Sequence, residues 1–396
     1  MTRKLFEEDV MLKSCQAVVT ACRELKKGYG LELDQTVFYP EGGGQLSDVG
    51  ELVFGGKSVK VAHVREKEGH ILHETEEPVP VGTKVEARLH WQSRFDHMQQ
   101  HCGEHLLSFG FWKLCGADNI GFHMSEEMVA IDLNKEVTSE EIAQVEALAN
   151  EHIQADLPVT TEWMEAAEAA EKAKRKFNDK LTGPVRVVAI KGSDSCTCCG
   201  THPPRTGMVG LVKIFKAEKH KQGTRISFLC GRLALEKINA CWQGLAEAAK
   251  ALSLKEEKIA DGVTRLLEEN RNLRERLGAL ERQRAIEMAG QLLKSSPAKE
   301  GIIDIVVQEN LSPEAAQVLA QELSKEPQVR GTIFYTQKDR LNYILVQGEA
   351  VPGSCRERIA SLNNFLGGRG GGKDRQAQGS APLREGWQEL VKERDL

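Results

Sequence analysis

Two short stretches of the 396-residue sequence contain side chains that could hold a metal ion. The first is HCGEH, in which His101 and His105 lie four residues apart. On an α-helix this spacing places both imidazoles on one face, about 5–6 Å apart at Cβ, which suits two ligands of a tetrahedral ion. Taken alone, an HxxxH pair is more commonly explained by two histidines with ordinary surface partners.

The second stretch is SCTCCGTHPPRTG, residues 195–207, where three cysteines precede one histidine. Cys198 and His202 have the spacing CxxxH, and Gly200 between them allows a tight turn. Cys199 is the alternative sulfur ligand, but it lies one residue nearer to His202, and we expect Cys198 to be the ligand. The two stretches together offer three imidazole nitrogens and one thiolate, which is a donor set typical of zinc. We therefore predict a metal site formed by His101, His105, Cys198 and His202.

A disulfide or a redox pair explains these cysteines less well. The N-terminus, MTRKLFEEDVMLKSC, lacks the apolar segment of a signal peptide, and no apolar run approaches the roughly 18–20 residues needed to span a bilayer. We therefore expect a cytoplasmic protein whose ten cysteines stay reduced. The spacing of Cys196, Cys198 and Cys199 also differs from the CxxC motif of redox enzymes.

The composition is that of a soluble globular protein with several domains. Hydrophobic residues make up 40% of the sequence and charged residues 28%, as in ordinary folded proteins. A chain of 396 residues exceeds one ordinary core, so two to four domains are expected. The net charge of −5 argues against general coating of nucleic acid, but a local basic surface remains compatible with it.

The elements that must position the two motifs indicate an α+β protein. Residues 1–90 alternate apolar and polar residues in short runs between turn residues, which indicates a small, mainly antiparallel β-barrel. Residues 91–234 begin at Trp91 with a helical pattern that carries HCGEH. They continue with the predicted strands MVAIDL, VRVVAI, LVKIF and RISFLC and the predicted helices SEEIAQVEALANEHIQA and EAAEAAEKAKRKF. The cysteine-rich loop lies between two of these strands, and residues 300–396 are again α/β.

Residues 235–299 are predicted to contain one long charged helix, from Leu235 to Lys294, with a coiled-coil stripe. Leucine or isoleucine recurs every seven residues at positions 252, 259, 266, 273 and 280, and Val263, Asn270 and Leu277 form the adjacent row. Asn270 could set the register or the choice of partner. The stripe can be covered by an intramolecular hairpin or by a second chain, and the sequence leaves both open. SSPAK at residues 295–299 ends the helix.

Two glycine-rich stretches lie outside the metal motifs. In FYPEGGGQLSDVG, residues 38–50, the backbone must be sharply bent or closely approached by another group. In FLGGRGGGKDRQAQGSA, residues 365–381, glycines expose backbone N–H groups beside basic side chains. That combination can bind phosphates, although a flexible loop is the alternative.

These motifs together resemble the alanyl-tRNA editing family. RFDHMQQHCGEHLL, CCGTHPPRTGMVGLVKIF, FYPEGGGQLSDVG and GFHMSEEMVAIDL are similar to segments of the alanyl-tRNA editing domain, and GGRGGGKDRQAQGSA resembles the end of the DHHA1 domain that closes alanyl-tRNA synthetases. The order of the motifs is that of the long, free-standing alanyl-tRNA editing proteins, and it covers nearly the whole chain. Cys199 departs from the glycine that is usual there. Because the chain has no room for an aminoacylation domain, we expect an editor and not a synthetase.

The resemblance implies a hydrolase that removes serine, or glycine, wrongly esterified to tRNA(Ala). A synthetase pocket rejects such amino acids only about 10–200-fold, so a second hydrolytic site is the standard remedy. The family's zinc ligands correspond to His101, His105, Cys198 and His202, with one Zn²⁺ per chain. A catalytic zinc normally keeps one coordination position open, so zinc either activates water or only orients the substrate.

Discrimination of serine from alanine predicts a polar pocket near the metal, and the resemblance implies where tRNA is bound. Thr36, Gln45 and His123 are candidates for contact with the serine hydroxyl, the alternative being that they only satisfy local backbone groups. Residues 300–396 are expected to form a DHHA1-like domain that binds tRNA, with candidate contacts at Gly368, Arg369, Gly371, Lys373 and Arg375. Self-association into a homodimer, through the helical segment or through the C-terminal domain, is compatible with this arrangement.

Two other functions fit parts of the sequence. HCGEH also matches the HxxEH pattern of some metallopeptidases, in which Glu104 would be the general base. A zinc-stabilised RNA-binding accessory protein without catalysis is the second alternative. Neither accounts for as many segments as the editing hydrolase does.

Overall fold

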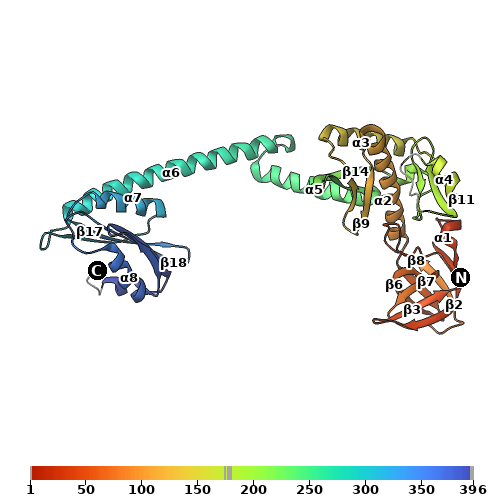
Figure 1. Ribbon diagram of the computed structural model, residues 1–396, viewed down its shortest axis with the longest axis horizontal. Coiled ribbons are helices and arrows are strands. Elements are labelled where there is room, and N and C mark those ends of the chain that lie inside the picture. Colours follow the sequence, from red (N-terminus) through yellow and green to blue (C-terminus); the bar gives the residue numbers. More distant parts are fainter. Residues whose placement is uncertain (1, 174, 176–180, 393–396) are drawn as a thin grey trace. The chain divides into compact units, whose positions relative to one another are not determined.

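The computed structural model describes residues 2–173, 175 and 181–392, and it divides into two compact units, Met1–Ala246 and Glu247–Leu396. Figure 1 labels many of the helices and strands of the two units. Their mixture of helices and mostly antiparallel strands confirms the α+β class. The finer division into domains at 1–90, 91–234, 235–299 and 300–396 stays a prediction. Within the described residues, no helix has the length and apolar character needed to cross a membrane.

A closed six-stranded barrel confirms the prediction for the start of the chain. Its strand order is β2-β3-β7-β6-β5-β8. The strands are β2 (Ser14–Glu24), β3 (Tyr29–Leu33), β5 (Gly50–Phe54), β6 (Lys57–Lys67), β7 (His70–Thr75) and β8 (Lys84–Leu89). The alternation seen in the sequence places one face of each strand inside, where Leu31, Leu52 and Ile71 are completely buried. Three short elements flank the barrel: β1 (Arg3–Lys4), α1 (Leu5–Glu8) and β4 (Gln35–Thr36).

Helix α2 (Trp91–Gly110) carries the HCGEH motif, as predicted, and continues into a π-helical turn, Phe111–Cys115. It packs closely on a four-stranded sheet of order β14-β15-β10-β9. A Cβ atom on Gly103 would lie 2.1 Å from Cys230 Sγ, so this glycine permits the close approach of α2 to β15. The sheet strands are β9 (Asn119–Met124), β10 (Val129–Leu133), β14 (Val212–His220) and β15 (Gly223–Cys230). Helix α3 (Ser139–Gln154) begins with a capping box formed by Thr138 and Glu141.

A three-stranded sheet holds the cysteine-rich loop. Its order is β11-β12-β13, with bounds β11 (Val159–Glu165), β12 (Pro184–Ile190) and β13 (Ser195–Thr197). The loop leaves β13 and reaches β14 through a 3₁₀ turn, Thr206–Val209. The predicted helix EAAEAAEKAKRKF is observed as α4 (Ala166–Lys172), and residues 174, 176 and 177 of it lie outside the described residues.

The prediction of a single long helix from Leu235 to Lys294 is wrong in one respect, because the structure has two helices there. Helix α5 (Gly231–Leu252) is followed by a 3₁₀ turn, Glu256–Lys258, and then by α6 (Ile259–Ser295). At the break Ser253 adopts a left-handed backbone, with φ of 53°. Leu254 folds back so closely that a Cβ atom on Gly262 would lie 2.3 Å from its Cδ1. Neither glycine nor proline marks this break, so local sequence signals do not reveal it.

The second unit contains a five-stranded sheet of order β16-β17-β18-β20-β19, in agreement with the predicted α/β pattern. The strands are β16 (Ile303–Gln308), β17 (Val329–Gln337), β18 (Arg340–Gln347), β19 (Arg369–Gly372) and β20 (Gln376–Pro382). The other helices are α7 (Pro313–Ser324), α8 (Cys355–Leu366) and α9 (Trp387–Lys392). Alternate residues of β18 contribute to two separate cores: Ile344 packs with residues of α6 and α7, and Tyr343 with residues of α8 and α9.

The glycine-rich stretch near the end of the chain is a strand, β19, at the edge of this sheet. It pairs with β20, where Gly370 lies opposite Gly379 and Gly372 opposite Ala377. A Cβ atom on either Gly370 or Gly372 would come within 2.4 Å of the β20 backbone. These two glycines therefore allow β19 to lie against its neighbour, and the flexible-loop alternative does not describe the structure.

Candidate metal centre

The two histidines of HCGEH lie on one face of α2, as their spacing predicts. His101 and His105 are each only 2% exposed, and their ring centroids are 5.4 Å apart. Buried histidines of this kind are not explained by ordinary surface partners. The helix therefore presents two imidazoles side by side toward the interior of the first unit.

Cys198 and His202 reach the same place from the loop after β13. The Cys198 amide donates to the carbonyl of Arg186 at 3.0 Å, and Arg186 Nη1 donates to the carbonyls of Cys198 and Gly200, at 2.8 Å each. The loop is thus fixed to strand β12 on both sides of Cys198. His202 is 5% exposed, and its ring centroid lies 4.6 Å from those of both His101 and His105.

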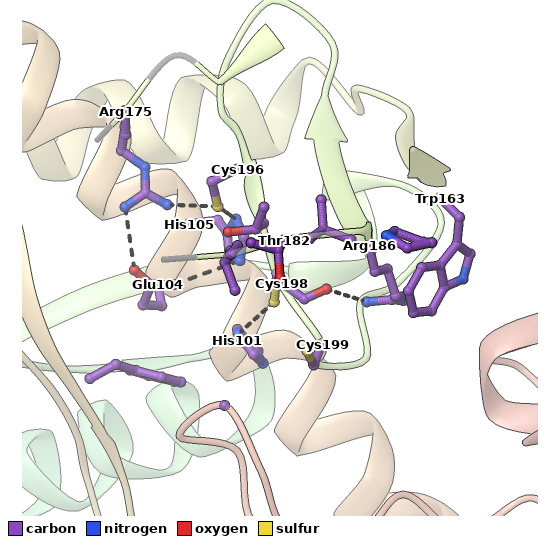
Figure 2. Close-up of a pocket in the computed structure, with 16 residues that line it drawn as sticks. His101, Glu104, His105, Trp163, Arg175, Thr182, Arg186, Cys196, Cys198 and Cys199 are labelled. Atoms are coloured by element: carbon purple, nitrogen blue, oxygen red, sulfur yellow. Dashed lines mark hydrogen bonds and ion pairs between the residues drawn. The ribbon is translucent and has the colours of Figure 1, made fainter. Parts of the chain in front are cut away.

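The four side chains converge with their ligand atoms within 4.8 Å of one another. Cys198 Sγ lies 3.3 Å from His101 Nε2 and 3.3 Å from His202 Nε2. Figure 2 shows Cys198 next to His101, with His105 nearer to Cys196 and Glu104. Three imidazoles and one thiolate at this separation fit a tetrahedral zinc ion. Their role as ligands stays a prediction.

Hydrogen bonds orient the two helix histidines. His101 Nδ1 lies 2.9 Å from Gln45 Oε1, and His105 Nδ1 lies 2.9 Å from Asp194 Oδ2. An acceptor at Nδ1 requires that this nitrogen carries the proton, which leaves Nε2 free to bind a metal. The arrangement matches the outer partners that metal-ligating histidines usually have, and it was not visible in the local spacing of the motif.

The electrostatics of Cys198 and His202 favour metal-binding protonation states. Burial raises the pKa of the Cys198 thiol, but the imidazoles of His101 and His202 outweigh it and hold that pKa well below its ordinary value. Burial also lowers the pKa of His202 to about 3, so this imidazole is neutral near pH 7. A thiolate and a neutral imidazole are the forms that bind zinc. At His105 burial lowers the pKa, but Cys196, Glu104 and Asp194 outweigh it and raise that pKa well above its ordinary value.

Two glycines make room for the cluster. A Cβ atom on Gly200 would lie 2.2 Å from His101 Nδ1, so the space beside His101, more than a tight turn, requires glycine there. A Cβ atom on Gly44 would lie 2.5 Å from the ring of Phe122, which itself packs 5.1 Å from the ring of His101. Gly44 also has a φ of 81°. The glycine-rich stretch is therefore both bent and closely approached.

The other two cysteines of the loop have different surroundings. Cys199 is exposed, and no contact joins it to the described histidines of the cluster. Cys196 Sγ lies 3.5 Å from His105 Nδ1 and 3.3 Å from Arg175 Nη2. Together with His105 and Asp194 it forms a second, smaller group of possible ligands. The convergence at Cys198 agrees with the choice of sulfur made from the sequence.

A cavity of about 610 Å³ opens beside the cluster. Its lining includes His101, His105 and Cys198 together with Glu104, the one carboxylate among its described lining residues. Glu104 Oε1 accepts hydrogen bonds from Ser108 Oγ at 2.5 Å and from Asn119 Nδ2 at 2.8 Å. Its other oxygen, Oε2, lies 3.8 Å from His105 Nε2. The cavity therefore offers candidate metal ligands and a carboxylate side by side.

The three residues predicted to contact a serine hydroxyl do not meet at one point, although Gln45 and His123 line the same hollow. Gln45 lies against the cluster, but its amide already binds His101 and Thr201. Thr36 is completely buried in the first unit, 2.8 Å from His73 Nε2. The His123 side chain is 59% exposed beside Asp132, and it lines a separate hollow with Gln45. The contact role of each stays a prediction.

The predicted tRNA contacts all belong to the second unit. Arg369 and Gly371 lie on β19, and Gly368 precedes it. Lys373 and Arg375 follow in the turn toward β20, where Arg375 Nη1 donates to the carbonyl of Gly348 at 2.5 Å. Arg369, Gly371, Lys373 and Arg375 are exposed.

Several residues around the cluster were missed from the sequence. Asp194, 1% exposed, binds Arg175 through Nε and Nη2 at 2.8 and 2.6 Å as well as orienting His105. Arg186 holds the loop, and Trp163 forms part of the cavity wall. Asp194 comes directly before the stretch 195–207 and four residues before Cys198, and this position was the only local sign of its role.

Comparisons with known proteins identify the family of the chain. The family model described as "Threonyl and Alanyl tRNA synthetase second additional domain" matches residues 185–227, and that described as "tRNA synthetases class II (A)" matches residues 6–93. The alanyl-tRNA editing protein AlaX-L of Pyrococcus horikoshii is 31% identical over 386 residues, which cover 96% of this chain and 94% of that protein. The chain belongs to the alanyl-tRNA editing protein family.

Further relatives of this family member show the same relationship. The alanyl-tRNA editing protein Aarsd1 of Mus musculus is 29% identical over 363 residues, covering 91% of this chain and 86% of its own length. The alanine–tRNA ligase of Pyrococcus furiosus is 31% identical over 390 residues, which cover 96% of this chain but 42% of the ligase. The resemblance to the alanyl-tRNA editing family is thus confirmed.

Proposed function

We propose that this protein is a trans-editing hydrolase that cleaves the ester bond of tRNA(Ala) mischarged with serine or glycine. The observation that carries the proposal is the convergence of His101, His105, Cys198 and His202 beside a cavity, in a chain of the alanyl-tRNA editing family. The relatives in P. horikoshii and mouse are both named as alanyl-tRNA editing proteins.

The four converging side chains would hold one zinc ion, which when bound polarises or positions the ester carbonyl. Gln45 and Asp194 keep the protons of His101 and His105 on Nδ1, at the side away from Cys198. Positioning of this kind typically changes metal affinity or activity 10- to 100-fold.

Glu104 is the chain's candidate for handling the attacking water. Glu104 lines the cavity. Ser108 and Asn119 hold its Oε1, and its Oε2 lies 3.8 Å from His105 Nε2. A carboxylate oxygen within reach of a water can accept its proton as the carbonyl is attacked, because geometry is the first requirement of a general base. In this scheme the proton passes from water to Glu104 and then to the leaving ribose oxygen.

The hydrolase must leave the ester bond of the correct product, alanyl-tRNA, intact. Serine differs from alanine by one hydroxyl, and a site that hydrogen-bonds this hydroxyl loses a partner when alanine is bound. Such a site discriminates far more strongly than an apolar pocket. Among the three predicted contact residues, Gln45 is the one that lies against the cluster.

Deacylation assays test the proposal. Ser-tRNA(Ala) should be hydrolysed, and Ala-tRNA(Ala) on the same tRNA body should be cleaved slower by orders of magnitude. Gly-tRNA(Ala) is assayed beside them to measure whether glycine is a second substrate. Cys198→Ala should lose both zinc and activity, because it removes the sulfur between two imidazoles. Cys199→Ala is the matched control and should keep both. Equal cleavage of all three esters by the wild type would reject the editing assignment.

Glu104→Gln separates the catalytic alternatives. It keeps the acceptor oxygen for Ser108 and Asn119 but loses the base, so kcat should fall roughly 100-fold or more with zinc content unchanged. Cleavage of peptides by the wild type that disappears in this variant would instead favour a metallopeptidase. Zinc-dependent tRNA binding without any ester cleavage would favour the accessory protein.

The second unit is proposed to bind the body of the tRNA. Arg369 and Lys373 are exposed on and just after the edge strand β19, where one side of the strand has no partner in its sheet. Phosphate contacts by lysine and arginine supply much of the affinity for nucleic acids and make it salt-dependent. A double Arg369→Ala and Lys373→Ala variant should therefore raise KM more than it lowers kcat.

A further inference from the structure

Trp163 is a large aromatic side chain left uncovered on the wall of the cavity. It lies on strand β11 and is 59% exposed, although it lines the same cavity as His105 and Cys198. Exposure alone carries little information, because single exposed apolar residues are common. Trp242 on α5, for example, is 60% exposed. The position of Trp163 is what distinguishes it.

Strand pairing determines that position. Trp163 lies directly opposite Arg186 of β12, and opposed residues of paired strands place their side chains on the same face of the sheet. Arg186 in turn holds the carbonyls of Cys198 and Gly200. The indole therefore stands on the sheet face that carries the candidate ligand loop. Figure 2 shows Trp163 beside Arg186, to one side of Cys198.

The chemistry of the proposed substrate defines what must lie beside the reacting ester. In an aminoacyl-tRNA the amino acid is esterified to the ribose of the 3′-terminal nucleotide, so the base of that nucleotide is only one sugar away. Once the ester enters the cavity, the terminal base must lie at the cavity wall. Unpaired bases of RNA are commonly held by stacking on aromatic side chains.

We propose that Trp163 is the stacking platform for the 3′-terminal base of the tRNA. The inference rests on the proposed function, because it needs the ester to be bound at the cluster. Strand β11 is at the edge of its three-stranded sheet, which leaves the indole accessible from outside. Arg186, only 7% exposed, ties this sheet to the ligand loop, so the platform keeps its position relative to Cys198.

The platform would contribute affinity without reading sequence. Stacking tolerates any base, since every base has a π-face. It would serve to place the terminal ribose, and with it the ester, at the same point for every mischarged tRNA. Loss of the indole should therefore weaken productive binding of tRNA substrates and leave the centre itself intact.

A double-mutant cycle tests this assignment. Wild type and Trp163→Ala are assayed on Ser-tRNA(Ala) with its normal 3′-terminal adenosine and on the same tRNA ending in an abasic nucleotide. We expect either change alone to lower kcat/KM roughly 5- to 150-fold, the range of one base–aromatic stack. We expect the two changes together to cost little more than one, because both remove the same contact. Trp163→Phe should retain most of the activity.

Controls make the result decisive. Trp242→Ala removes an equally exposed indole and should have no effect, and all variants should keep the zinc content of the wild type. The proposal would be overturned if the two changes together lower kcat/KM by the product of their separate effects. It would also be overturned if Trp163→Ala were as active as the wild type. If the wild type leaves Ser-tRNA(Ala) intact, the proposed function fails instead. In that case the stacking role of Trp163 can be tested separately by measuring, through fluorescence anisotropy, how tightly the protein binds uncharged minihelices that end in adenosine or in an abasic nucleotide.

Discussion

At the residue scale, the absence of a side chain at Gly200 matters as much as the ligands themselves. A methyl group at this position would lie nearest to Cε1 and Nδ1 of His101, at 2.1 and 2.2 Å, and then to Gln45 Oε1 at 2.8 Å. Contacts this short require that something moves. Because α2 fixes the backbone of His101, its imidazole is the group that must give way.

We therefore predict that Gly200→Ala damages the candidate metal centre. Displacing His101 should also break its hydrogen bond to Gln45 and lower zinc affinity at least 10-fold, the usual effect of losing an orienting partner. Zinc content after dialysis against a weak chelator measures the change. Gly244→Ala, on α5 with open space around the new methyl group, is the control. Full zinc retention in Gly200→Ala would show that the loop can shift without cost.

At the scale of elements, α6 has an apolar stripe that the described residues leave uncovered. Val263, Leu266, Leu273, Leu277 and Leu280 are between 44% and 65% exposed, so the described residues of the second unit do not cover them. Because of the break at Ser253, the stripe starts at Ile259 and not at Leu252. About three heptads therefore remain for a coiled coil.

Charge placement on α6 favours a parallel pairing with a second copy. In a parallel pair, the residue before Asn270 or Leu277 on one helix faces the residue after the next leucine of the seven-residue row, Leu273 or Leu280, on the partner. On this helix that places Glu269 opposite Arg274 and Arg276 opposite Glu281, each an attractive pair. Asn270 would meet its own copy, where the two amides can bond each other. An antiparallel pair would instead place Asn270 against leucine.

We predict a concentration-dependent homodimer through α6. Leu273→Asp should abolish it, because a carboxylate enters the apolar seam. Glu269→Arg should raise the dimer Kd roughly 10-fold by placing like charges together, and the double variant Glu269→Arg with Arg274→Glu should restore it. Sedimentation equilibrium measures all four proteins. A monomeric wild type at tens of micromolar would reject the dimer, and failure of the double variant would reject the parallel arrangement.

At the scale of the whole molecule, the candidate metal centre and the proposed tRNA-binding strand lie in different compact units. All four candidate ligands lie in Met1–Ala246, and the basic edge strand lies in Glu247–Leu396. Helix α6 belongs with the second unit, because Ala285 and Ala289 are buried against its core. To separate the two parts, the chain should therefore be truncated after Leu252, before α6 begins.

We predict that residues 1–252 form an independent editing core. This fragment should fold, hold about one zinc ion and hydrolyse Ser-tRNA(Ala) at high enzyme concentration. Its KM should be higher and the salt dependence of kcat/KM weaker than in the full chain, because phosphate contacts are lost. Steady-state kinetics at several salt concentrations measure both. A fragment with unchanged KM would show that the second unit does not bind tRNA.

Local spacing in the sequence was sufficient to predict the barrel strands and each of the two pairs of candidate ligands. Alternation of apolar residues predicted the barrel strands, and a four-residue repeat predicted that His101 and His105 share a helix face. Such features depend on neighbours within one turn or one strand, so periodicity reveals them. The Cys198–His202 pair is also local, since both belong to one short loop.

Donor chemistry suggested from the sequence that the two halves belong to one site, but only the tertiary structure shows how they meet, because Cys198 and His101 are 97 positions apart and packing alone brings them together. The same holds for Gln45 and Asp194, whose hydrogen bonds to the histidines come from other segments. It also holds for Trp163, which strand pairing with Arg186 places beside the ligand loop. The break after α5 depends on Leu254 packing on Gly262, a contact that helix propensity does not record. Sequence periodicity reports on short-range backbone preference, whereas these features depend on long-range contacts.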